Sequence, residues 1–212
     1  IEHLLEDLQS HVLIGRYEGD TDAEGLQHGQ GTCTFANGAT YTGQWASGQM
    51  HGKGEYKFPW GDTYMGEFRA GQRHGIGEYR YSSGNCYTGQ FQDNKRHGLG
   101  VYDYTSGAQY DGAFAFDQRH GHGKYRFPNG DVYEGDYVRG QMTGTGAMTH
   151  IDGTKYTGDW LNGSMHGKGK LVYGDGSQYV GEFADGEKHG KGLYTYANGD
   201  VFRGEHRKDG ML

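Results

Sequence analysis

Residues 41–63 read YTGQWASGQMHGKGEYKFPWGDT, and this stretch decides the fold. In residues 41–45 and again in residues 52–58, large side chains alternate with polar residues or glycine, which is the period-two pattern of a half-buried strand. Residues 46–51 lie between the two runs and are expected to turn the chain, and Trp60-Gly61 is expected to make a second turn. We therefore expect residues 41–63 to form a β-hairpin.

The same pattern returns along the chain with a fixed period. A Tyr-x-Gly motif, or Phe-x-Gly in the last copy, recurs after 24 residues once and after 23 residues seven times. The copies begin at Tyr17, Tyr41, Tyr64, Tyr87, Tyr110, Tyr133, Tyr156, Tyr179 and Phe202. His-Gly-x-Gly keeps the same period and is replaced only once, at Thr143. Such a period indicates a repeat array in which each unit buries its apolar side against its neighbours.

The expected fold is all-β: an elongated, single-layer antiparallel meander of tandem hairpins over residues 15–212. Side-chain parity places Tyr41, Gly43 and Trp45 on an aromatic face, with Thr42 and Gln44 on the other face. The glycines of the aromatic face leave room for a ring to lie flat on the backbone. At about 4.8 Å per strand, nine repeats predict a rod on the order of 85 Å long.

The composition favours a folded chain that packs rings instead of aliphatic side chains. Gly supplies 42 of the 212 residues, and 18 Tyr, 9 Phe and 3 Trp are far more rings than disordered chains carry. The formal net charge of -7 argues against nucleic acid as a partner and weakens electrostatic attraction to anionic lipid. No apolar run is long enough for a membrane-spanning helix, and no signal peptide is visible. A chain that begins at Ile1 is expected to be part of a longer protein, and Cys33 and Cys86, too far apart for a disulfide, fit a reducing compartment.

The first 14 residues differ from the repeats. Ile1, Leu4, Leu5, Leu8 and Val12 have the spacing of an amphipathic helix of about three turns. We expect residues 1–14 to cap the end or the open edge of the aromatic face, as repeat arrays require. A contact with a partner helix or a second copy is the alternative.

Motifs of catalytic chemistry are missing from the sequence, so we expect neither an enzyme nor a cofactor. There is no Gly-x-Ser-x-Gly, and no Gly-Lys pair is followed by Ser or Thr. Acidic residues recur with the period at Glu67, Asp136, Asp159, Glu182 and Glu205, which predicts a surface ladder and not a catalytic pair.

The recurring histidines do not predict a metal site. Equivalent positions in such a sheet lie about 10 Å apart, whereas metal ligands must converge to about 2 Å from one ion. We expect these histidines to pack in the turns and no metal to bind. A site that uses His11, His150 or His206 is the alternative.

The consensus Y-x-G-x-W-x-x-G-x-x-H-G-x-G-x-Y-x-F-x-x-G over residues 17 to about 206 resembles the MORN repeat (membrane occupation and recognition nexus). The resemblance implies a curved single-layer sheet with an aromatic-lined groove. It also implies a cytoplasmic scaffold of the cytoskeleton, or one at the inner face of a membrane. Some relatives join the repeats to a kinase or methyltransferase domain, and this chain contains no such domain.

We expect a non-catalytic scaffold that binds a partner helix or peptide along its aromatic face. The expected partner-binding residues are Trp45, Tyr56, Phe58, Phe68, Tyr79, Tyr81, Phe91, Tyr102 and Tyr104. The bland alternative is that these rings are simply the core of a thin sheet. A second alternative is a phosphoinositide or membrane-surface binder that uses Lys53, Lys57, Arg69, Arg73, Lys95 and Arg96. A third is the specificity arm of a larger enzyme.

The last repeat is expected to form a homodimer contact. It reads as half a hairpin over residues 202–212, and an unpaired edge strand pairs readily with a second chain. The expected contact residues are Phe202, His206 and Leu212.

The repeat at residues 133–155 is expected to be the weakest of the array. It carries Thr143, Met148 and His150 where most other repeats carry His and two large side chains. Fewer rings are expected to stack there.

Overall fold

The structure is a computed structural model, and it describes residues 14–207 and 210–211. The helix expected over residues 1–14 lies outside the described residues except for Ile14, where the first strand begins. The chain divides into two units, residues 1–105 and residues 106–212, and each is described by itself.

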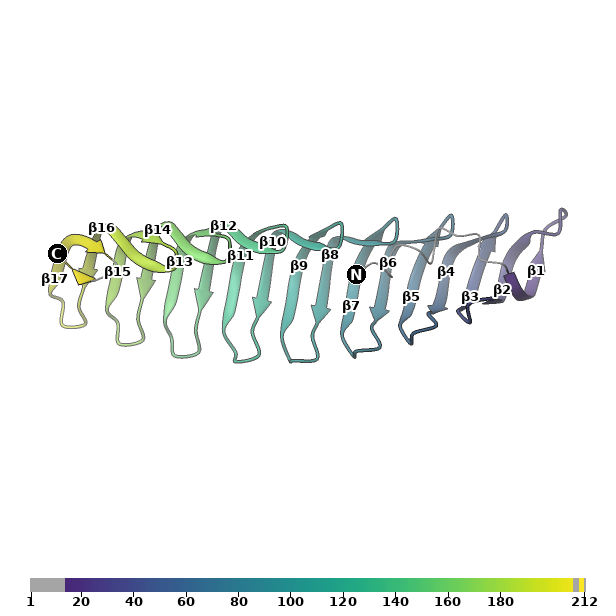
Figure 1. Ribbon diagram of the computed structural model, residues 1–212, viewed down its shortest axis with the longest axis horizontal. Coiled ribbons are helices and arrows are strands. Elements are labelled where there is room, and N and C mark those ends of the chain that lie inside the picture. The colour runs from purple at the N-terminus through teal and green to yellow at the C-terminus, as the bar shows by residue number, and fades with distance from the viewer. Residues whose placement is uncertain (1–13, 208–209, 212) are drawn as a thin grey trace. The chain divides into compact units, whose positions relative to one another are not determined.

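Unit 1 contains eight strands, each antiparallel to the next in sequence. They are β1 (Ile14–Thr21), β2 (Gln27–Phe35), β3 (Thr40–Ala46), β4 (Gln49–Lys57), β5 (Thr63–Arg69), β6 (Gln72–Arg80), β7 (Cys86–Gln92) and β8 (Lys95–Asp103). Figure 1 shows these strands as a row of hairpins in chain order. The described part of unit 1 is a single open sheet.

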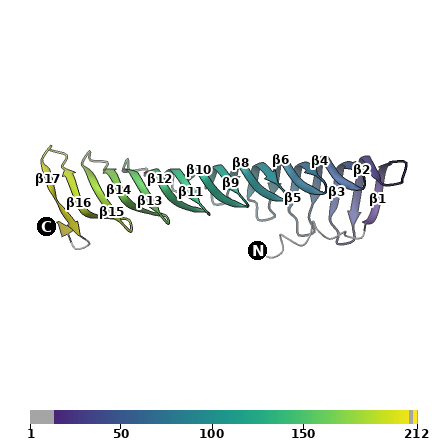
Figure 2. The same cartoon turned by 90° about the horizontal axis from the view of Figure 1, so that it is seen from above.

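Unit 2 repeats the arrangement with ten strands. They are β9 (Gln109–Ala115), β10 (Gln118–Arg126), β11 (Val132–Val138), β12 (Gln141–Thr149), β13 (Lys155–Leu161), β14 (Ser164–Val172), β15 (Gln178–Ala184), β16 (Glu187–Thr195), β17 (Val201–Arg207) and β18 (Gly210–Met211). Seen from above in Figure 2, its strands again follow one another in chain order. The prediction of an all-β antiparallel meander is confirmed.

The two turns of each repeat differ in length. Between β3 and β4 only Ser47 and Gly48 leave the ladder, and both have positive φ (48° and 76°), as a two-residue type I′ hairpin requires. This turn is shorter than the expected residues 46–51, because Ala46 still pairs with Gln49. The second turn is longer: the Phe58 amide donates to the Asp62 carbonyl at 2.9 Å.

A bulge interrupts each hairpin and shifts its register by two residues, so the side chains before and after it keep the same alternation of faces. Gly43 pairs with Gly54, but the next residue, Gln44, pairs with His51, so two residues of β4 have no partner in β3. Gly52 lies in this bulge with φ 57°, a conformation that favours glycine. Met50 lies opposite Trp45 on the aromatic face and is only 8% exposed.

The core of each unit consists of aromatic rings that pack edge-to-face in a row on one face of the sheet. In unit 1 the ring of Tyr41 meets Trp45 of its own repeat edge-on at 5.2 Å and Phe68 of the next repeat at 4.9 Å. In unit 2 Tyr156 meets Trp160 and Phe183 at 5.3 and 4.9 Å. These edge-to-face pairs join each hairpin to its neighbour. No helix that could cross a membrane is found among residues 14–207 and 210–211.

Candidate partner-binding faces

Tyrosines that open the repeats are the framework of the aromatic face; we call them framework tyrosines (Tyr41, Tyr64, Tyr87, Tyr110, Tyr133, Tyr156 and Tyr179). All are essentially buried. The Tyr41 hydroxyl donates to the Gln44 carbonyl at 2.8 Å and lies 3.3 Å from the His51 carbonyl. Its ring lies on the glycine pair, so a Cβ added to Gly54 would come within 2.4 Å of the ring. Burial raises the pKa of the Tyr41 phenol, and it raises that of Tyr156 to about 12.

Most of the residues expected to bind a partner belong to this core. Seven of the nine are buried, namely Trp45, Tyr56, Phe58, Phe68, Tyr79, Phe91 and Tyr102. Tyr81 and Tyr104 are half-buried. They pack on Tyr79 and Tyr102 at 4.5 and 4.4 Å between ring centroids. Of the nine expected residues, these two present the largest ring surface to solvent.

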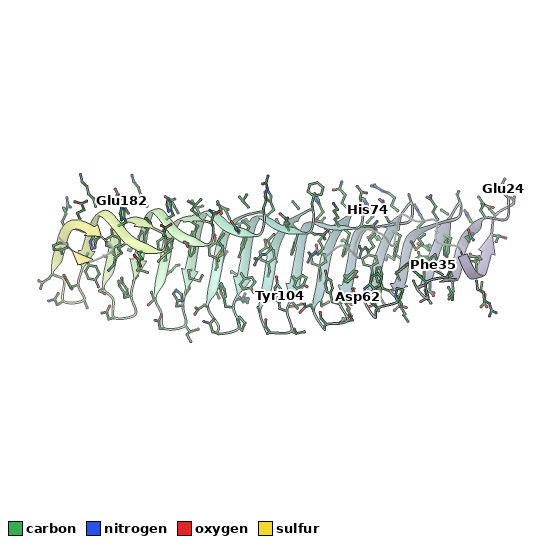
Figure 3. All side chains as sticks on the ribbon, in the orientation of Figure 1. Glu24, Phe35, Asp62, His74, Tyr104 and Glu182 are labelled. Carbon is green, nitrogen blue, oxygen red and sulfur yellow. The ribbon has the colours of Figure 1, made fainter. Side chains whose placement is uncertain are left out.

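Polar groups of the long turns connect neighbouring repeats of unit 1. Asp62 accepts hydrogen bonds from the Tyr79 hydroxyl at 2.6 Å and from the Ser82 amide at 2.8 Å. Burial acts to raise the pKa of Asp62, but these hydrogen bonds outweigh it and hold the pKa below its usual value. In Figure 3 Asp62 and Tyr104 lie toward the long turns, whereas His74 lies toward the two-residue turns. Asp62 therefore fastens one repeat to the next.

A buried cation in the aromatic face was not expected from the sequence. Arg73 occupies the position equivalent to Met50 and is 6% exposed. Its guanidinium carbon lies 5.0–5.8 Å from the ring centroids of Phe58, Tyr64, Tyr79 and Phe91. Its guanidinium also donates to the Asn94 carbonyl at 2.8 Å. Arg96, Arg119 and Lys188 lie over rings in the same way. The residue one before each recurring His was the available signal, since it is Met, Arg or Lys in every copy except the first, where Gln27 precedes His28.

The recurring acidic position has a structural role at the bulge. The Asp159 carboxylate accepts a hydrogen bond from the Lys168 amide at 2.8 Å, directly after Gly167 with its positive φ of 57°. The Gln44 and Gln90 side chains accept from the Lys53 and Leu99 amides in the same way, at 2.8 and 2.7 Å. These side chains cap the bulge, and we call their position the cap position.

The face opposite the rings presents side chains that change from repeat to repeat. The residue between the Tyr and the Gly of the repeat motif is Thr42, Met65, Thr88, Asp111, Glu134, Thr157, Val180 or Arg203. Met65, Ile76 and Leu99 are apolar here, yet 61%, 62% and 66% exposed. We call this surface the variable face, because the framework beneath it is constant.

The expected basic surface for lipid does not form one patch in unit 1. Arg73 is buried among rings, and Arg96 lies over Tyr87 and Tyr102. Lys57 lies 3.3 Å from Glu55, and Arg69 lies 3.8 Å from Asp93. Cations that lie in the core or beside carboxylates leave little positive charge for a headgroup.

The expected dimer contact is divided between core and surface. His206 is buried against Tyr179, with ring centroids 4.7 Å apart, and burial and then Lys188 lower its pKa, so the ring is neutral at pH 7. Phe202 is half-buried, and Leu212 lies outside the described residues. The end of β17 is not an unpaired edge, because His206 pairs with Met211 and Arg207 pairs with Gly210 of β18. Over the described residues, Val201–Gly204 have ladder partners only in β16.

His150 and the other histidines show no converging ligand set in the described ranges, 14–207 and 210–211, where no group of three potential metal ligands occurs. His150 instead lies 2.8 Å from Asp131, atom Nδ1 to Oδ2, and this hydrogen bond is the main cause that lowers the pKa of Asp131. His11 lies outside the described residues. Cys33 is buried, Cys86 is half-buried, and both are free thiols.

Comparisons with known proteins agree with this geometry. The domain-family model described as the MORN repeat matches eight consecutive segments, residues 23–40, 41–63, 64–86, 87–109, 110–132, 133–155, 156–178 and 179–201. The copies expected at Tyr17 and Phe202 begin outside the matched segments. Comparison with curated proteins gives no match.

Among solved structures, the chain is similar to structures from the microcephaly protein CPAP. The G-box domain of CPAP, whose study suggests a role in centriole elongation, is 17% identical over 86% of this chain and 95% of that chain, with a TM-score of 0.52. The wild-type TCP10 domain of CPAP from Danio rerio is 11% identical over 91% of each chain, with a TM-score of 0.50. At these identities the likeness shows a common fold alone. The eight matched repeats, by contrast, span most of the chain, and the chain belongs to the MORN-repeat family.

Proposed function

We propose that this protein is a non-catalytic protein-interaction module that acts as a scaffold in the cytoplasm, associated with the cytoskeleton. One observation carries the proposal: a constant buried framework supports a variable exposed face. Residues such as Met65, Ile76 and Leu99 contribute little to the packed rings, yet they place apolar surface in water. Exposed apolar groups on a rigid sheet favour recognition of other proteins.

The aromatic strip remains part of the proposal in a narrower form. Tyr81 and Tyr104 are half-buried and present part of their rings to solvent, whereas their neighbours Tyr79 and Tyr102 are buried in the core. A partner helix or peptide on this side would therefore contact the outer rings first.

Capture experiments with the purified protein test the proposal and separate the two faces. One variant replaces Tyr81 and Tyr104 by Ser, and the other replaces Met65 and Leu99 by Ser, so each removes two large exposed groups from one face. The Met65/Leu99 variant should melt close to the wild type, and the Tyr81/Tyr104 variant should melt lower, because both rings pack on core tyrosines; circular dichroism must show that both are folded at the temperature of the experiment. We expect cross-linking and capture to recover partners with the wild type and to lose them with one of the variants. Recovery of nothing beyond an empty matrix would reject the module.

Self-association through the end of unit 2 belongs to the same proposal, as a two-fold homodimer. The edge of β17 over Val201–Gly204 supports it, because a second copy of this strand can pair with that edge. We expect light scattering to give a dimer mass at tens of micromolar protein, and Phe202→Glu to shift it toward the monomer. A monomer mass for the wild type would reject the dimer and leave the module.

Binding to phosphoinositides stays a weaker candidate function. The cations expected to carry it lie in the aromatic core or beside carboxylates, as Arg73 and Lys57 do. A role as the arm of a larger enzyme has no supporting observation within the described residues.

A further inference from the structure

The variable face of unit 2 carries a shallow hollow across β15, β16 and β17. It encloses about 540 Å³, within the range of ligand-binding clefts. Its lining residues are Val180, Lys191, Gly192, Leu193, Arg203, Gly204 and Glu205. Gly192 and Gly204 pair beneath the hollow and belong to the aromatic face, where the Tyr179 ring lies on Gly192, so the floor of the hollow is backbone between two rows of side chains.

The strand register defines these two rows and extends them to β14. One row runs across the strands through Lys170, Val180, Leu193 and Arg203. The other row runs through Lys168, Glu182 and His189, and Lys191, in the bulge of β16 after His189, continues it by pairing with Glu205. We call the hollow with its two rows the trough.

The trough is locally basic in an acidic chain. Lys168, Lys170, Lys191 and Arg203 are exposed, against the two carboxylates Glu182 and Glu205. The formal charge of the whole chain is -7, so this positive surface opposes the general field of the protein. A local reversal of charge favours a partner segment that is itself acidic.

The first row has an apolar centre between two cations. Val180, 45% exposed, is opposite Leu193, and Lys170 and Arg203 follow on either side. Adjacent strands are about 4.8 Å apart, so Lys170 and Arg203 are separated by three strand spacings, about 14 Å. Four residues of an extended chain span about 13 Å, with the first, third and fifth side chains on one side.

We infer that the trough docks an extended acidic peptide of a partner protein, with the pattern acidic-x-apolar-x-acidic. The two acidic side chains pair with Lys170 and Arg203, and the apolar side chain covers Val180 and Leu193. This inference deepens the proposed function and rests on it, since it assigns one partner chemistry to the variable face.

The geometry favours a peptide over an anionic bilayer. The apolar centre matches a single apolar side chain, and a lipid headgroup offers none at that depth. Glu182 and Glu205 interrupt the cations and would repel a continuous negative surface, whereas a peptide can place polar residues beside them.

Fluorescence anisotropy with a labelled synthetic peptide tests the inference on the full chain. The probe is a nonapeptide with blocked ends and the centre Glu-Ser-Leu-Ser-Glu, and a second peptide carries Gln in place of each Glu. We expect the acidic peptide to bind, with affinity that falls as salt rises, and the Gln peptide to bind about tenfold more weakly or less well still.

The variant K170E/R203E should weaken binding of the acidic peptide about tenfold or more. The control K53E/R126E makes the same change of charge at exposed positions outside the trough, and its affinity should stay within about twofold of the wild type. Circular dichroism confirms that both variants are folded. If either double variant does not fold, K170Q and R203Q tested singly take its place with the same expectation.

Three results would overturn the inference: no binding of the acidic peptide, equal binding of both peptides, or equal losses in K170E/R203E and K53E/R126E. Sedimentation with phosphatidylcholine vesicles that contain phosphatidylserine provides a further arm. Vesicle binding that depends on Lys170 and Arg203, without peptide binding, would overturn it in favour of a membrane surface.

If K170E/R203E keeps every partner that the wild type captures, the trough is rejected and the module stands. If the wild type captures none, the module itself fails.

Discussion

The ring of each framework tyrosine fills the space that side chains would occupy at its two glycines. The Tyr41 ring covers Gly43 and Gly54, and its hydroxyl closes on the backbone carbonyl of Gln44. A Cβ at Gly54 would lie 2.4 Å from the Tyr41 ring. The ring cannot easily move away, because the hydrogen bond from its hydroxyl to the Gln44 carbonyl holds it in place. Glycine is required here by space and not by a left-handed backbone, since Gly54 has no positive φ.

The variant Gly54→Ala tests this requirement against a matched glycine. We expect it to lower the free energy of unfolding by about 3 kcal/mol, as overpacking of a tight core does. Gly71→Ala is the control: its φ is 77°, nothing lies within 4 Å of its added Cβ, and it should cost about 1 kcal/mol. Urea denaturation measures both, and equal losses would contradict the proposed role of the ring.

One repeat lacks the cap of its bulge and can be improved. Ala113 occupies the cap position beside Gly121, whose φ is 71°, and a methyl group cannot accept the hydrogen bond that Gln44 and Gln90 accept. We expect Ala113→Gln to raise the free energy of unfolding by about 0.5–1.5 kcal/mol. The reverse change, Gln44→Ala, should lower it by a similar amount. A denaturation midpoint unmoved by Ala113→Gln would argue against capping.

Residue parity explains both the success and the failure of the sequence analysis at this scale. Alternation in residues 41–45 placed Tyr41 and Trp45 on the buried face correctly. Residues 46–51 were expected to turn the chain, whereas only residues 47–48 do, and so Met50 and its equivalent Arg73 were not recognised as core residues. The nine expected binding residues have the right face, but packing between neighbouring hairpins, invisible in one repeat, buries seven of them.

At the scale of the element, hairpins differ in how many rings they contribute. The repeat at residues 64–86 packs Tyr79, Tyr81 and Arg73 against its neighbours. The equivalent positions of residues 133–155 hold Met148, His150 and Met142. Met148 and His150 are both half-buried, whereas Tyr79 is 2% exposed.

Hydrogen exchange should therefore be faster in β12 than in β6. Fewer rings must separate to open the 133–155 hairpin, so local opening costs less free energy there. The hydrogen bond between His150 and Asp131 compensates only in the turn. Mass spectrometry of peptides from the two strands compares them within one sample. Slower exchange in β12 than in β6 would contradict the prediction.

On the scale of the whole molecule, the framework tyrosines form one titrating population spread over both units. Burial raises the pKa of Tyr41, Tyr64, Tyr133 and Tyr179, and raises that of Tyr156 to about 12. An unfolded tyrosine has a pKa of about 10. The prediction of a rod of about 85 Å stays a prediction at this scale.

Alkaline unfolding follows from these shifts. The folded pKa lies above the unfolded one, so the contribution to stability is fully present below pH about 10 and is lost as the pH rises through about 12. We expect tyrosinate absorbance and loss of the sheet signal in circular dichroism to rise together over this window. Ionisation well before any loss of the sheet would show that the phenols are accessible in the folded state.

The repetition of contacts across the 23-residue period has a genetic consequence. Tyr41 packs on Phe68, and in a chain without residues 64–86 it would meet Phe91, the same ring type at the same offset. Gly54 would pair with Gly89 instead of Gly66, and Asp62 would meet the amide of Thr105 instead of Ser82. Unequal recombination between repeats would thus shorten or lengthen the gene by whole copies, and the contacts across each new junction would be of the same kind as before. We expect the chain lacking residues 64–86 to fold with a melting temperature near that of the wild type, whereas removal of an arbitrary block of the same length should not. Selection can therefore set the number of repeats independently of the side chains that each one displays.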